Sequence, residues 1–542
     1  MHQRVGYISS PPMTERRDQH DRSVKAPAPA LDQREVFAAL SDPATHGMSG
    51  PVKRIDTHAA AVFLAGPNVY KVKKAVRFPF MDQSTLEQRR RACEAEVAVN
   101  RHFTPELYFG VVPITREGGR LRVAGSGEPV EWAVHLQRFD ETRTLDLVAD
   151  RGEITSGMIA EIAALILESH RVAAVGDGPI ATAALGGVVE ETLTELLEAP
   201  AIFPREDAEP LAAAMRSAFA AMRDLLLLRG ANGRVRRCHG DLHLRNVALL
   251  DRGPVLFDAI EFSESIATTD VLYDLAFALM DLWERRLFAE ANLLLNRYFW
   301  KSDELPGELA GLAALPLFMS LRASVLAKIA AIRYRDVDHA LATRTEALRY
   351  FETACELFRP AAPILIAVGG RSGSGKTTVA ARIAPDIGRA PGAVHLRSDV
   401  ERKRRLGVAE SERLPQSAYG REVTAQVYAA LREMAETTLR AGQSVIVDAV
   451  HSTPEERALV QAVATRANVR FIGLWLDAPV DVLVDRVALR SGDASDADAN
   501  VVRAQARYPI GDIDWVRLDA AAPLDTVTRT ANAAVSEAQL AS

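Results

Sequence analysis

A glycine-rich loop in the last third of the chain constrains the fold more than any other stretch. Residues 363–378 read PILIAVGGRSGSGKTT, an apolar run that leads into a complete G-x-x-x-x-G-K-[ST] motif. The apolar run, 364–368, has the length of a strand buried on both faces, and the glycines let backbone N–H groups turn toward phosphate oxygens. The pattern predicts a strand, a phosphate-binding loop and a helix at 379–383.

The motif assigns a task to each residue type in the loop. Lys376 is expected to reach the β- and γ-phosphates and the Thr377 hydroxyl to contact a metal ion, so ATP and Mg²⁺ are the predicted cofactors. A glycine-rich turn without a ligand is the alternative, which the strand, the spacing and the lysine-threonine pair disfavour. The predicted nucleotide-binding residues are Gly370, Arg371, Ser372, Gly373, Ser374, Gly375, Lys376, Thr377 and Thr378.

The position of this loop divides the chain into domains. Because it follows the first strand of its own domain, everything before about residue 360 must fold separately, and 542 residues are too many for one core. Residues 1–30 are rich in Pro, Ser, Arg and Asp and predict a disordered tail. We therefore expect one domain at 31–360 and a second at 361–542.

Composition favours a soluble, cytoplasmic protein. The net charge is −6, which argues against nonspecific nucleic-acid binding, and no signal peptide is expected because the N-terminus lacks an apolar core. The longest apolar stretch, 312–332, is interrupted by Arg322 and Lys328, so no membrane partner is expected. The three cysteines are widely spaced and predict neither disulfides nor a zinc site.

Alternating elements follow the glycine loop. Apolar runs at 393–396, 444–447 and 469–476 predict further strands, and the alternation with helices predicts a parallel sheet covered on both faces. Asp399 follows the first of these runs, where α/β sheets bind ligands, and Arg402 lies one helical turn later. Asp448 ends the next run and is expected to order the metal site.

In the first domain, lysines cluster on one predicted strand. Residues 59–74 read as a hairpin around Gly-Pro-Asn, and the second strand carries Lys71, Lys73 and Lys74. Lys71 and Lys73 share a face, so one of them is expected to point into a cleft, unless the strand is simply basic and exposed. The helix expected at 84–101 offers Glu94 and Glu96 as acidic partners.

The stretch 238–246, CHGDLHLRN, carries the spacing of a kinase catalytic loop. Asp241 is followed five residues later by Asn246, and a further apolar run ends in Asp258, where a kinase places its second metal ligand. The alternative is that His239 and His243 are core histidines and Asp241 a turn residue, which the coincidence of so many fixed residue types disfavours.

HGDLHLRN resembles the HGDxHxxN loop of the aminoglycoside phosphotransferase and choline kinase family, and Asp270 with Asp274 resembles the helix that follows it. The resemblance implies an α+β, protein-kinase-like, two-lobed domain with a hinge at 132–138 that transfers phosphate from ATP to a hydroxyl group. The departures are a missing DFG and a missing GxGxxG, and the resemblance does not choose between Lys71 and Lys73 or between Glu96 and Glu94. Its implied roles are Asp241 as base, Asn246 and Asp258 as Mg²⁺ ligands, Lys71 as phosphate lysine and Glu96 as its partner.

The second domain is similar to small P-loop kinases of the gluconate kinase, polynucleotide kinase and zeta-toxin types, an α/β fold with a parallel sheet. The D-x-x-R of Asp399 and Arg402 resembles their acceptor motif, and the resemblance implies that Asp399 deprotonates a hydroxyl. Arg486, Arg490 and Arg503 flank a polar stretch and resemble a lid; a solvated, salt-bridged loop is the alternative. Thr377 and Asp448 are the expected metal residues of this domain.

Taken whole, the chain resembles a bacterial two-domain family in which an aminoglycoside-phosphotransferase-like kinase is fused to a P-loop kinase-like domain. Three interpretations follow: a kinase with two ATP sites acting on a small-molecule hydroxyl, one active kinase with the P-loop domain as an ATPase switch, or a kinase for nucleotide or nucleic-acid 5′-hydroxyls. We rank them in that order. Glu190, Glu191, Glu195 and Glu198 are expected to form a solvated helix face rather than a pocket for polycations, and the sequence predicts no oligomeric state.

Overall fold

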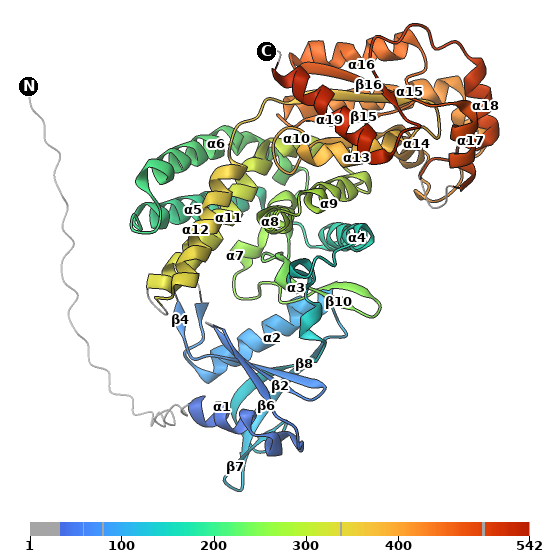
Figure 1. Cartoon of the computed structure of the whole chain (residues 1–542). Helices are drawn as coiled ribbons and strands as arrows, with labels where there is room; N and C mark the ends of the chain where they lie inside the picture. Colours follow the sequence, from blue (N-terminus) through green and yellow to red (C-terminus); the bar gives the residue numbers. More distant parts are fainter. Residues whose placement is uncertain (1–32, 58, 79–80, 336–338, 490–493, 541–542) are drawn as a thin grey trace, which may run out of the picture.

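The computed structural model describes residues 33–57, 59–78, 81–335, 339–489 and 494–540. The predicted tail at 1–30 lies outside the described residues, and so does Arg490. The chain runs through three bodies, an N-lobe, a helical C-lobe and a P-loop domain, with the N-lobe and the P-loop domain at opposite ends of the C-lobe (Figure 1).

The N-lobe is built on an antiparallel sheet with the strand order β1-β2-β3-β8-β6-β7. The predicted hairpin is present as β2 and β3, and α2 begins with a capping box formed by Thr85 and Gln88. Its elements are α1 (Gln33–Ser41), η1 (Pro43–His46), β1 (Lys53–Asp56), β2 (Ala60–Ala65), β3 (Asn68–Lys73), β4 (Arg77–Phe78), β5 (Met81–Asp82), α2 (Leu86–Phe103), β6 (Tyr108–Glu117), β7 (Arg120–Val123) and β8 (Glu128–Gln137).

The prediction of a hinge at 132–138 was wrong for most of that range. Residues 132–137 belong to β8, which pairs with β3 on one side and β6 on the other and is therefore a central strand. Apolar residues such as Ala133 and Val134 are buried there, because a central strand is covered on both faces. The connection to the C-lobe begins at Arg138.

The C-lobe is mainly helical and surrounds a few short strands. The apolar residues at 158–169, 211–228 and 272–284 recur with helical periodicity and lie in α4, α6 and α8. Its elements are η2 (Glu141–Arg143), α3 (Leu145–Asp150), α4 (Ser156–Val172), α5 (Gly178–Leu197), α6 (Arg205–Ala231), β9 (Val235–Arg237), η3 (Leu244–Asn246), β10 (Val247–Leu250), β11 (Gly253–Leu256), α7 (Glu264–Ala267), β12 (Thr268–Asp270), α8 (Val271–Glu284), α9 (Phe288–Trp300), α10 (Leu305–Gly311), η4 (Leu312–Ala314), α11 (Leu315–Arg333) and α12 (Leu341–Leu357).

Within the C-lobe, the stretch Leu305–Arg333 is apolar and long enough to cross a membrane by length and composition. In its most apolar window, however, 72% is buried inside the molecule, against helices such as α8 and α12. Arg322, one of the two charges that interrupt the run, lies over the rings of Tyr273 and Phe277. The stretch therefore serves as a core helix of the C-lobe.

The P-loop domain contains a parallel five-stranded sheet with the order β14-β15-β13-β16-β17, which confirms the predicted α/β fold. Alternate residues of β13 face opposite layers: Ile364 and Ile366 pack with α13 and α19, whereas Leu365 and Ala367 pack with α15 and α16. Its elements are β13 (Ile364–Gly370), α13 (Lys376–Ile383), η6 (Ala384–Asp386), β14 (Val394–Arg397), α14 (Ser398–Arg405), η7 (Gln416–Tyr419), α15 (Arg421–Arg440), β15 (Val445–Asp448), α16 (Pro454–Ala467), β16 (Arg470–Asp477), α17 (Val480–Leu489), α18 (Ala499–Arg507), β17 (Val516–Asp519) and α19 (Leu524–Leu540).

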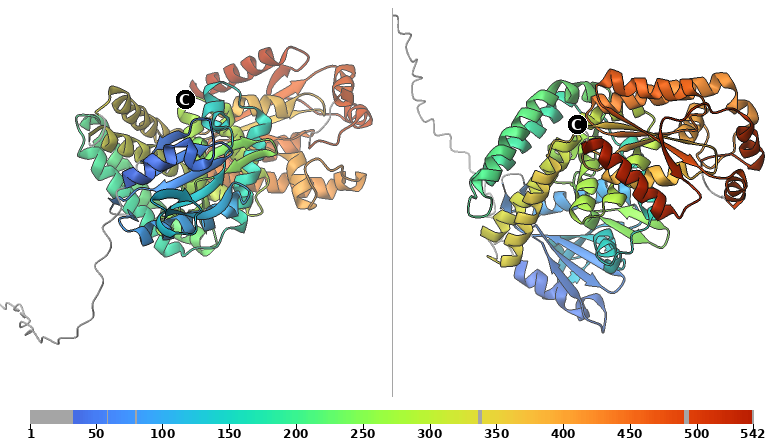
Figure 2. Two further views of the ribbon diagram at one scale, coloured as in Figure 1. Left: turned by 90° about the horizontal axis from the view of Figure 1, so that it is seen from below. Right: turned by 45° about the horizontal axis from the view of Figure 1, so that its top comes forward.

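The C-lobe and the P-loop domain share one apolar core. Buried residues of α10 and α11, such as Leu309 and Leu315, belong to the same cluster as Leu431 and Met434 of α15. The right-hand view of Figure 2 shows the P-loop domain packed directly against the C-lobe helices. Because this core crosses the boundary, the P-loop domain has a large apolar face that only the C-lobe covers.

The segment 388–392, which precedes β14, is part of this interface. The Arg389 guanidinium donates to the backbone oxygen of Leu312 at 3.0 Å and to that of Ala441. The Asn292 amide of α9 donates to the backbone oxygen of Pro391 at 3.0 Å. The turn therefore connects two strands of one domain while bonding to helices of the other.

Candidate functional site

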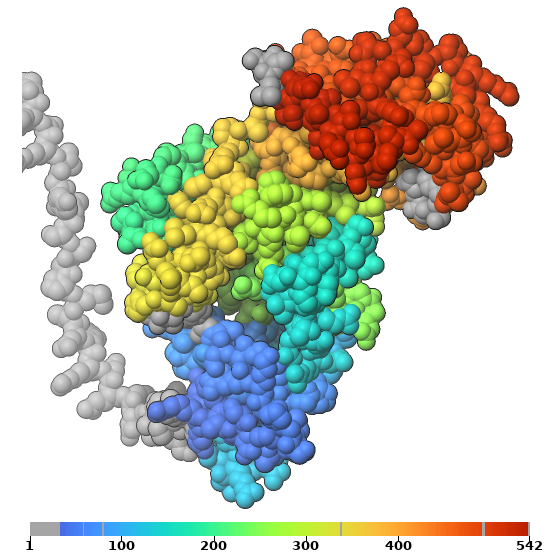
Figure 3. All heavy atoms as spheres, in the orientation of Figure 1, coloured from blue at the N-terminus to red at the C-terminus, as the bar shows by residue number. Residues whose placement is uncertain are grey.

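A charge cluster between the lobes gathers the residues that the kinase resemblance singles out. Lys71 Nζ lies 3.0 Å from Glu96 Oε1 and 2.5 Å from Asp258 Oδ1, so the N-lobe strand, the N-lobe helix and the C-lobe meet at one ammonium group. The Asp258 side chain is 43% exposed, whereas Glu96 is completely buried. Figure 3 shows the surface hollowed where the N-lobe meets the C-lobe.

Lys73 lies on the same face but deeper in the lobe. Its ammonium group is 2.5 Å from Glu96 Oε2 and 2.5 Å from Glu261 Oε1, and the residue is only 3% exposed. Glu94, the other sequence candidate, points outward and pairs with Arg90 on the exposed side of α2. The geometry therefore brings Lys71 and Glu96 together at the cleft and gives Lys73 a buried partner that the sequence analysis missed, Glu261.

Two effects oppose each other in this cluster, and the ion pairs win. Burial alone would disfavour the charged form of Glu96, yet Lys71 and Lys73 outweigh it and lower the pKa of Glu96 to about 2. Burial likewise opposes the charge of Lys71, but Asp258 and Glu96 raise its pKa well above the usual value. Glu96, Lys71 and Lys73 are therefore charged at neutral pH.

The catalytic-loop candidates Asp241 and Asn246 are in direct contact. The Asn246 amide nitrogen donates to Asp241 Oδ2 at 3.0 Å, which leaves the amide oxygen outside this bond. His243 Nε2 lies 3.3 Å from the same carboxylate, and although burial opposes ionisation, His243 holds the pKa of Asp241 well below its usual range. The Asp241 side chain remains 39% exposed, so an acceptor can reach it.

His239 joins this loop to the strand end that carries Asp258. Its Nε2 bonds to the backbone oxygen of Phe257 at 3.0 Å, and its Nδ1 accepts from the Asp241 N–H at 3.4 Å. Asp258 itself has a φ of 60°, a conformation that costs energy in a residue with a side chain and that is found most often at functional sites. The Asp258 N–H donates to the Tyr108 hydroxyl at 3.2 Å.

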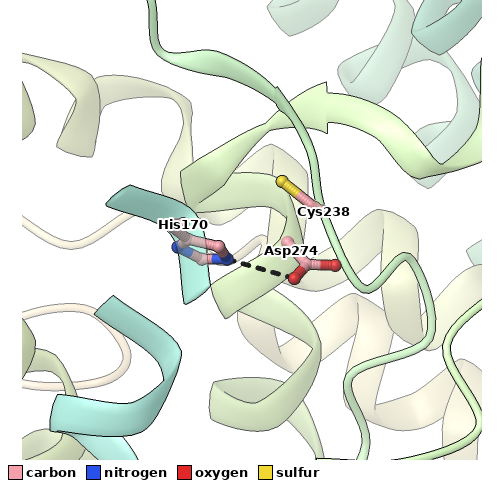
Figure 4. A group of neighbouring side chains, drawn as sticks. All are labelled: His170, Cys238 and Asp274. Atoms are coloured by element: carbon pink, nitrogen blue, oxygen red, sulfur yellow. Dashed lines mark hydrogen bonds and ion pairs between the residues drawn. The ribbon is translucent and has the colours of Figure 1, made fainter. Parts of the chain in front are cut away.

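Beneath the loop, His170, Cys238 and Asp274 lie close together (Figure 4), with ligand atoms within 4.8 Å of one another. Each is already engaged: His170 Nε2 with Asp274 Oδ2 at 3.1 Å, Asp274 Oδ1 with the Gly240 N–H at 2.8 Å, and Cys238 Sγ with a backbone oxygen. Burial raises the pKa of the Cys238 thiol well above its usual value, which disfavours the thiolate that metals bind. The group is a support for the catalytic loop.

A small pocket of about 100 Å³ adjoins the loop 238–246 at His243. Its wall combines apolar residues of α11 with charged groups that already have partners, since Glu346 pairs with Arg333 and Asp281 pairs with Arg285. The lining residues are His243, Arg245, Asp281, Leu326, Ile329, Ala330, Arg333, Glu346 and Tyr350.

The acidic residues Glu190, Glu191 and Glu195 lie elsewhere, on α5. They pair with Arg216, Lys328 and Arg335, and Glu191 is 71% exposed. This arrangement is that of a solvated helix face.

In the P-loop domain, the loop follows β13 as the motif predicts. Gly373 has a φ of 83°, and a Cβ added there would lie 2.7 Å from a backbone oxygen of α17, so only glycine fits. Thr377 Oγ1 donates to Asp448 Oδ2 at 2.6 Å, and Lys376 Nζ donates to the Arg371 oxygen at 3.0 Å. The strand ends of β13 and β15 thus bring the predicted metal residues together.

Burial opposes ionisation of Asp448, but a hydrogen bond from His395, at 3.3 Å, and nearby positive charge lower its pKa to about 2. His395 was not singled out from the sequence. The sequence signal for His395 is its position in an apolar run that predicts a buried strand, because a polar side chain in such a strand needs a partner.

Asp399 and Arg402 both lie in α14, next to Tyr419. Burial raises the pKa of Asp399, the opposite of Asp448, and Asp448 itself adds to the rise. Arg402 is 5% exposed; it donates to the backbone oxygen of Ala418 at 2.8 Å and lies 4.8 Å from the centre of the Tyr419 ring. A carboxylate with a raised pKa beside one with a lowered pKa is an arrangement suited to proton transfer next to a metal site.

The predicted lid residues are only partly brought together. Arg486 donates to the backbone oxygen of Ala520 at 2.7 Å, and Arg503 is exposed on α18. Gln505, in the described part of this region, contacts the P-loop: its side chain accepts from the Ser372 N–H at 2.8 Å and donates to the Ser372 hydroxyl at 3.1 Å. No motif marks Gln505, so the sequence analysis missed it.

Both sites fit a magnesium-bound nucleotide. The P-loop offers a glycine cradle, a lysine and a threonine-aspartate pair, and the interlobe cluster offers a lysine with two oxygen ligands, Asn246 and Asp258. Oxygen ligands of this kind suit Mg²⁺ better than softer metals. Kinase and P-loop families use ATP, which supports the same assignment.

Comparison with known proteins agrees with this division. Residues 67–312 match the phosphotransferase enzyme family, and residues 365–508 match a family described as an AAA domain. Uncharacterized proteins of Mycobacterium tuberculosis and Mycobacterium bovis are 29% identical to this chain over 478 residues, which cover 86% of this chain and 92% of theirs.

Among solved structures, a choline/ethanolamine kinase family protein from Mesorhizobium loti is 15% identical with a TM-score of 0.39, covering 60% of this chain and 95% of that protein. A gluconokinase from Sinorhizobium meliloti 1021 is 24% identical with a TM-score of 0.25, covering 33% of this chain and 94% of that protein.

The two matches support a phosphotransferase class of protein. One part of this chain is similar to the phosphotransferase enzyme family and a second part, which carries the P-loop, is similar to the AAA domain family, in agreement with the two resemblances in its sequence. The mycobacterial relatives match across both parts.

Replacing Glu96 by Gln should destabilise the folded chain, because Lys71 and Lys73 would lose the carboxylate that they share. We expect the free energy of unfolding at neutral pH to fall by roughly 3 kcal/mol, the usual cost of breaking a buried ion pair. The pKa of Glu96 is lowered from 4.5 to about 2, so this contribution is complete above pH 4.5 and is lost as the pH falls toward 2.

Urea unfolding at several pH values measures this difference. Glu94→Gln, which removes an exposed ion pair of the same helix, is the matched control and should change little. Equal effects of the two substitutions at neutral pH would contradict the central role of Glu96.

Proposed function

We propose that this protein is an ATP-dependent phosphotransferase with two separate nucleotide sites, each transferring phosphate to a hydroxyl group of a small molecule. The observation that carries the proposal is the contact of Lys71 with both Glu96 and Asp258, opposite the Asp241-Asn246 pair. Phosphoryl transfer is catalysed mainly by positioning and charge neutralisation, and this cluster offers both.

At the first site, Asp241 is the proposed base. Its lowered pKa keeps it ionised, and its partial exposure leaves it open to an acceptor hydroxyl. Asp241 would take the hydroxyl proton as the hydroxyl oxygen bonds to the γ-phosphorus of ATP and the bond from that phosphorus to the oxygen of ADP breaks. Asn246 and Asp258 would hold Mg²⁺, which neutralises the phosphate charge when bound. Lys71 would contact the phosphates, while Lys73 remains occupied by Glu96 and Glu261.

The acceptor of the first site is proposed to be a small molecule bound in the pocket beside His243. His243, which lies 3.3 Å from the Asp241 carboxylate, lines this pocket, so an acceptor bound there would lie beside the proposed base. The pairing of Asp281 and Glu346 with arginines favours a neutral or mixed-charge acceptor over a polycation.

The cytoplasm is the proposed location of the protein, because ATP is available there.

At the second site, Asp399 is the proposed base and Arg402 is proposed to hold the acceptor. The raised pKa of Asp399, near the ionised Asp448, supports this role because a base must be able to accept the proton of an alcohol. A domain that only hydrolyses ATP as a switch would need an oriented water and no such acceptor group. Arg486 and Arg490 remain proposed lid residues, with Gln505 as the contact that ties this region to the P-loop. Closure of such a lid would exclude water and slow hydrolysis.

The broad test is a metabolite-library screen of the full chain with ATP and Mg²⁺, with new phosphorylated products identified by mass spectrometry. The proposal requires at least one product whose formation depends on Asp241. Hydrolysis of ATP with no phosphorylated product from any library member would contradict it.

Asp241→Asn should slow phosphorylation of the acceptor found in the screen by on the order of a hundredfold or more, because the base is lost while the fold remains. Steady-state kinetics measures the loss, and circular dichroism checks the fold. Asp251→Asn, on an exposed turn of the same lobe, is the control and should retain full activity. A folded Asp241→Asn protein with normal turnover would exclude Asp241 as the base.

The chain should bind two Mg²⁺-ATP per protomer at separable sites. Lys376→Ala should remove one by weakening the β/γ-phosphate contacts, and Asp258→Ala the other by removing a metal ligand. Isothermal titration calorimetry with a non-hydrolysable analogue gives the stoichiometry, and Lys53→Ala, which alters an exposed lysine, should leave it at two. A single site that either substitution abolishes would favour one composite site.

Asp399→Asn should distinguish a kinase from a switch at the second site. In the full chain carrying Asp241→Asn, we expect slow ATP hydrolysis that Asp399→Asn barely changes and a transfer activity that it nearly abolishes. The full chain is needed because the isolated P-loop domain would expose the core that it shares with the C-lobe. Rapid hydrolysis without an acceptor, unaffected by Asp399→Asn, would favour the switch.

A further inference from the structure

The contact between α9 and β14 replaces a missing strand. β14 lies at the edge of the P-loop sheet, so one row of its backbone groups has no neighbouring strand to bond with. Asn296 of α9 accepts from the His395 N–H at 2.7 Å and donates to the Ala393 oxygen at 3.3 Å. One turn further along the helix, the Trp300 indole donates to the His395 oxygen at 2.8 Å.

Both backbone groups of His395 are therefore held by side chains of the kinase domain. The same residue reaches into the P-loop site with its ring, since His395 Nε2 lies 3.3 Å from Asp448 Oδ2. That carboxylate oxygen also accepts from the Thr377 hydroxyl. A displacement of His395 along or away from the sheet would therefore move the group that orients the metal-site carboxylate.

The strand also sets the position of the acceptor residues. β14 ends at Arg397, and α14 begins at the next residue. Asp399 therefore lies just beyond the strand whose position is fixed at His395. A small shift at a strand end alters the geometry of every group that follows it in the site.

We propose that Asn296 and Trp300 of the kinase domain are positioning residues of the P-loop site, acting through His395 on Asp448. This inference rests on the proposed binding of Mg²⁺-ATP by the P-loop. The C-lobe thus helps to complete the P-loop site by determining where the metal-ordering carboxylate of Asp448 lies.

The test uses the full chain with Asp258→Ala, in which only the P-loop site is expected to bind nucleotide. We measure the Mg²⁺ dependence as the Mg²⁺ concentration at which binding of a non-hydrolysable ATP analogue is half-maximal. Asn296→Ala should raise this concentration by about tenfold, the loss of metal affinity found for residues that orient a metal ligand. Calorimetry at a series of Mg²⁺ concentrations measures this without any acceptor. A failed transfer reaction would therefore leave the test intact, and the two proposals can fail separately.

A double-mutant cycle shows whether Asn296 acts through His395. His395→Ala should raise the half-maximal Mg²⁺ concentration similarly, and Asn296→Ala should add little in that background, because the linking residue is already gone. Effects that simply add would overturn the proposed route.

A matched interface variant separates positioning from general stability. Arg389→Ala removes a domain contact to Leu312 that does not touch His395, so it should lower the unfolding temperature but leave the Mg²⁺ dependence unchanged within about twofold. Equal effects of Arg389→Ala and Asn296→Ala on the Mg²⁺ dependence would overturn the proposal.

If Asn296→Ala does not fold, Trp300→Phe takes its place. This substitution removes only the indole N–H that bonds to the His395 oxygen and keeps most of the aromatic packing. It should shift the Mg²⁺ dependence in the same direction by a smaller factor. An unchanged Mg²⁺ dependence in a folded Trp300→Phe protein would contradict the positioning role.

Discussion

The open edge and the apolar face of the P-loop sheet are the constraint on which the rest of the structure depends. Strand β14 needs partners for its backbone groups, and the face that contacts α15 and α16 continues into the C-lobe core. A free edge strand invites pairing with other chains, and an exposed apolar face invites aggregation. Helices α15 and α16 cover the apolar face, while the C-lobe bonds to the open edge and packs its own apolar residues against α15, so the two domains form one folded unit.

At the other end of the C-lobe, electrostatics determines how the lobes meet. Burying Glu96 and Lys73 would be unfavourable for either group alone, but each charge has a partner at hydrogen-bond distance. Asp258 remains at the edge of this cluster, open to solvent and close to Lys71. The cluster holds the N-lobe against the C-lobe and leaves the groups at its solvent side available for ligands.

Helix α9 contacts both the edge of the P-loop sheet and the residues that support the loop 238–246. Its Tyr298 hydroxyl is 3.0 Å from His170 Nδ1, and His170 bonds to Asp274, which accepts the N–H of Gly240 in the catalytic loop. Two residues before Tyr298, Asn296 bonds to the edge of the P-loop sheet. The supports of the two sites are therefore built on a single helix.

The sequence by itself determined the two fold classes and which residues are candidates for each site. Contiguous motifs allowed this: the glycine loop has the spacing of a phosphate-binding loop, and the spacing of Asp241 and Asn246 places both in one loop. Only the tertiary structure decided which lysine faces the cleft, because Lys71 and Lys73 lie on the same strand face and differ only in depth. The roles of Glu261, His395 and Gln505 were likewise hidden, since each bonds to a residue far away in the chain. Long-range pairs leave no local pattern, whereas the periodicity of helices, strands and loops does.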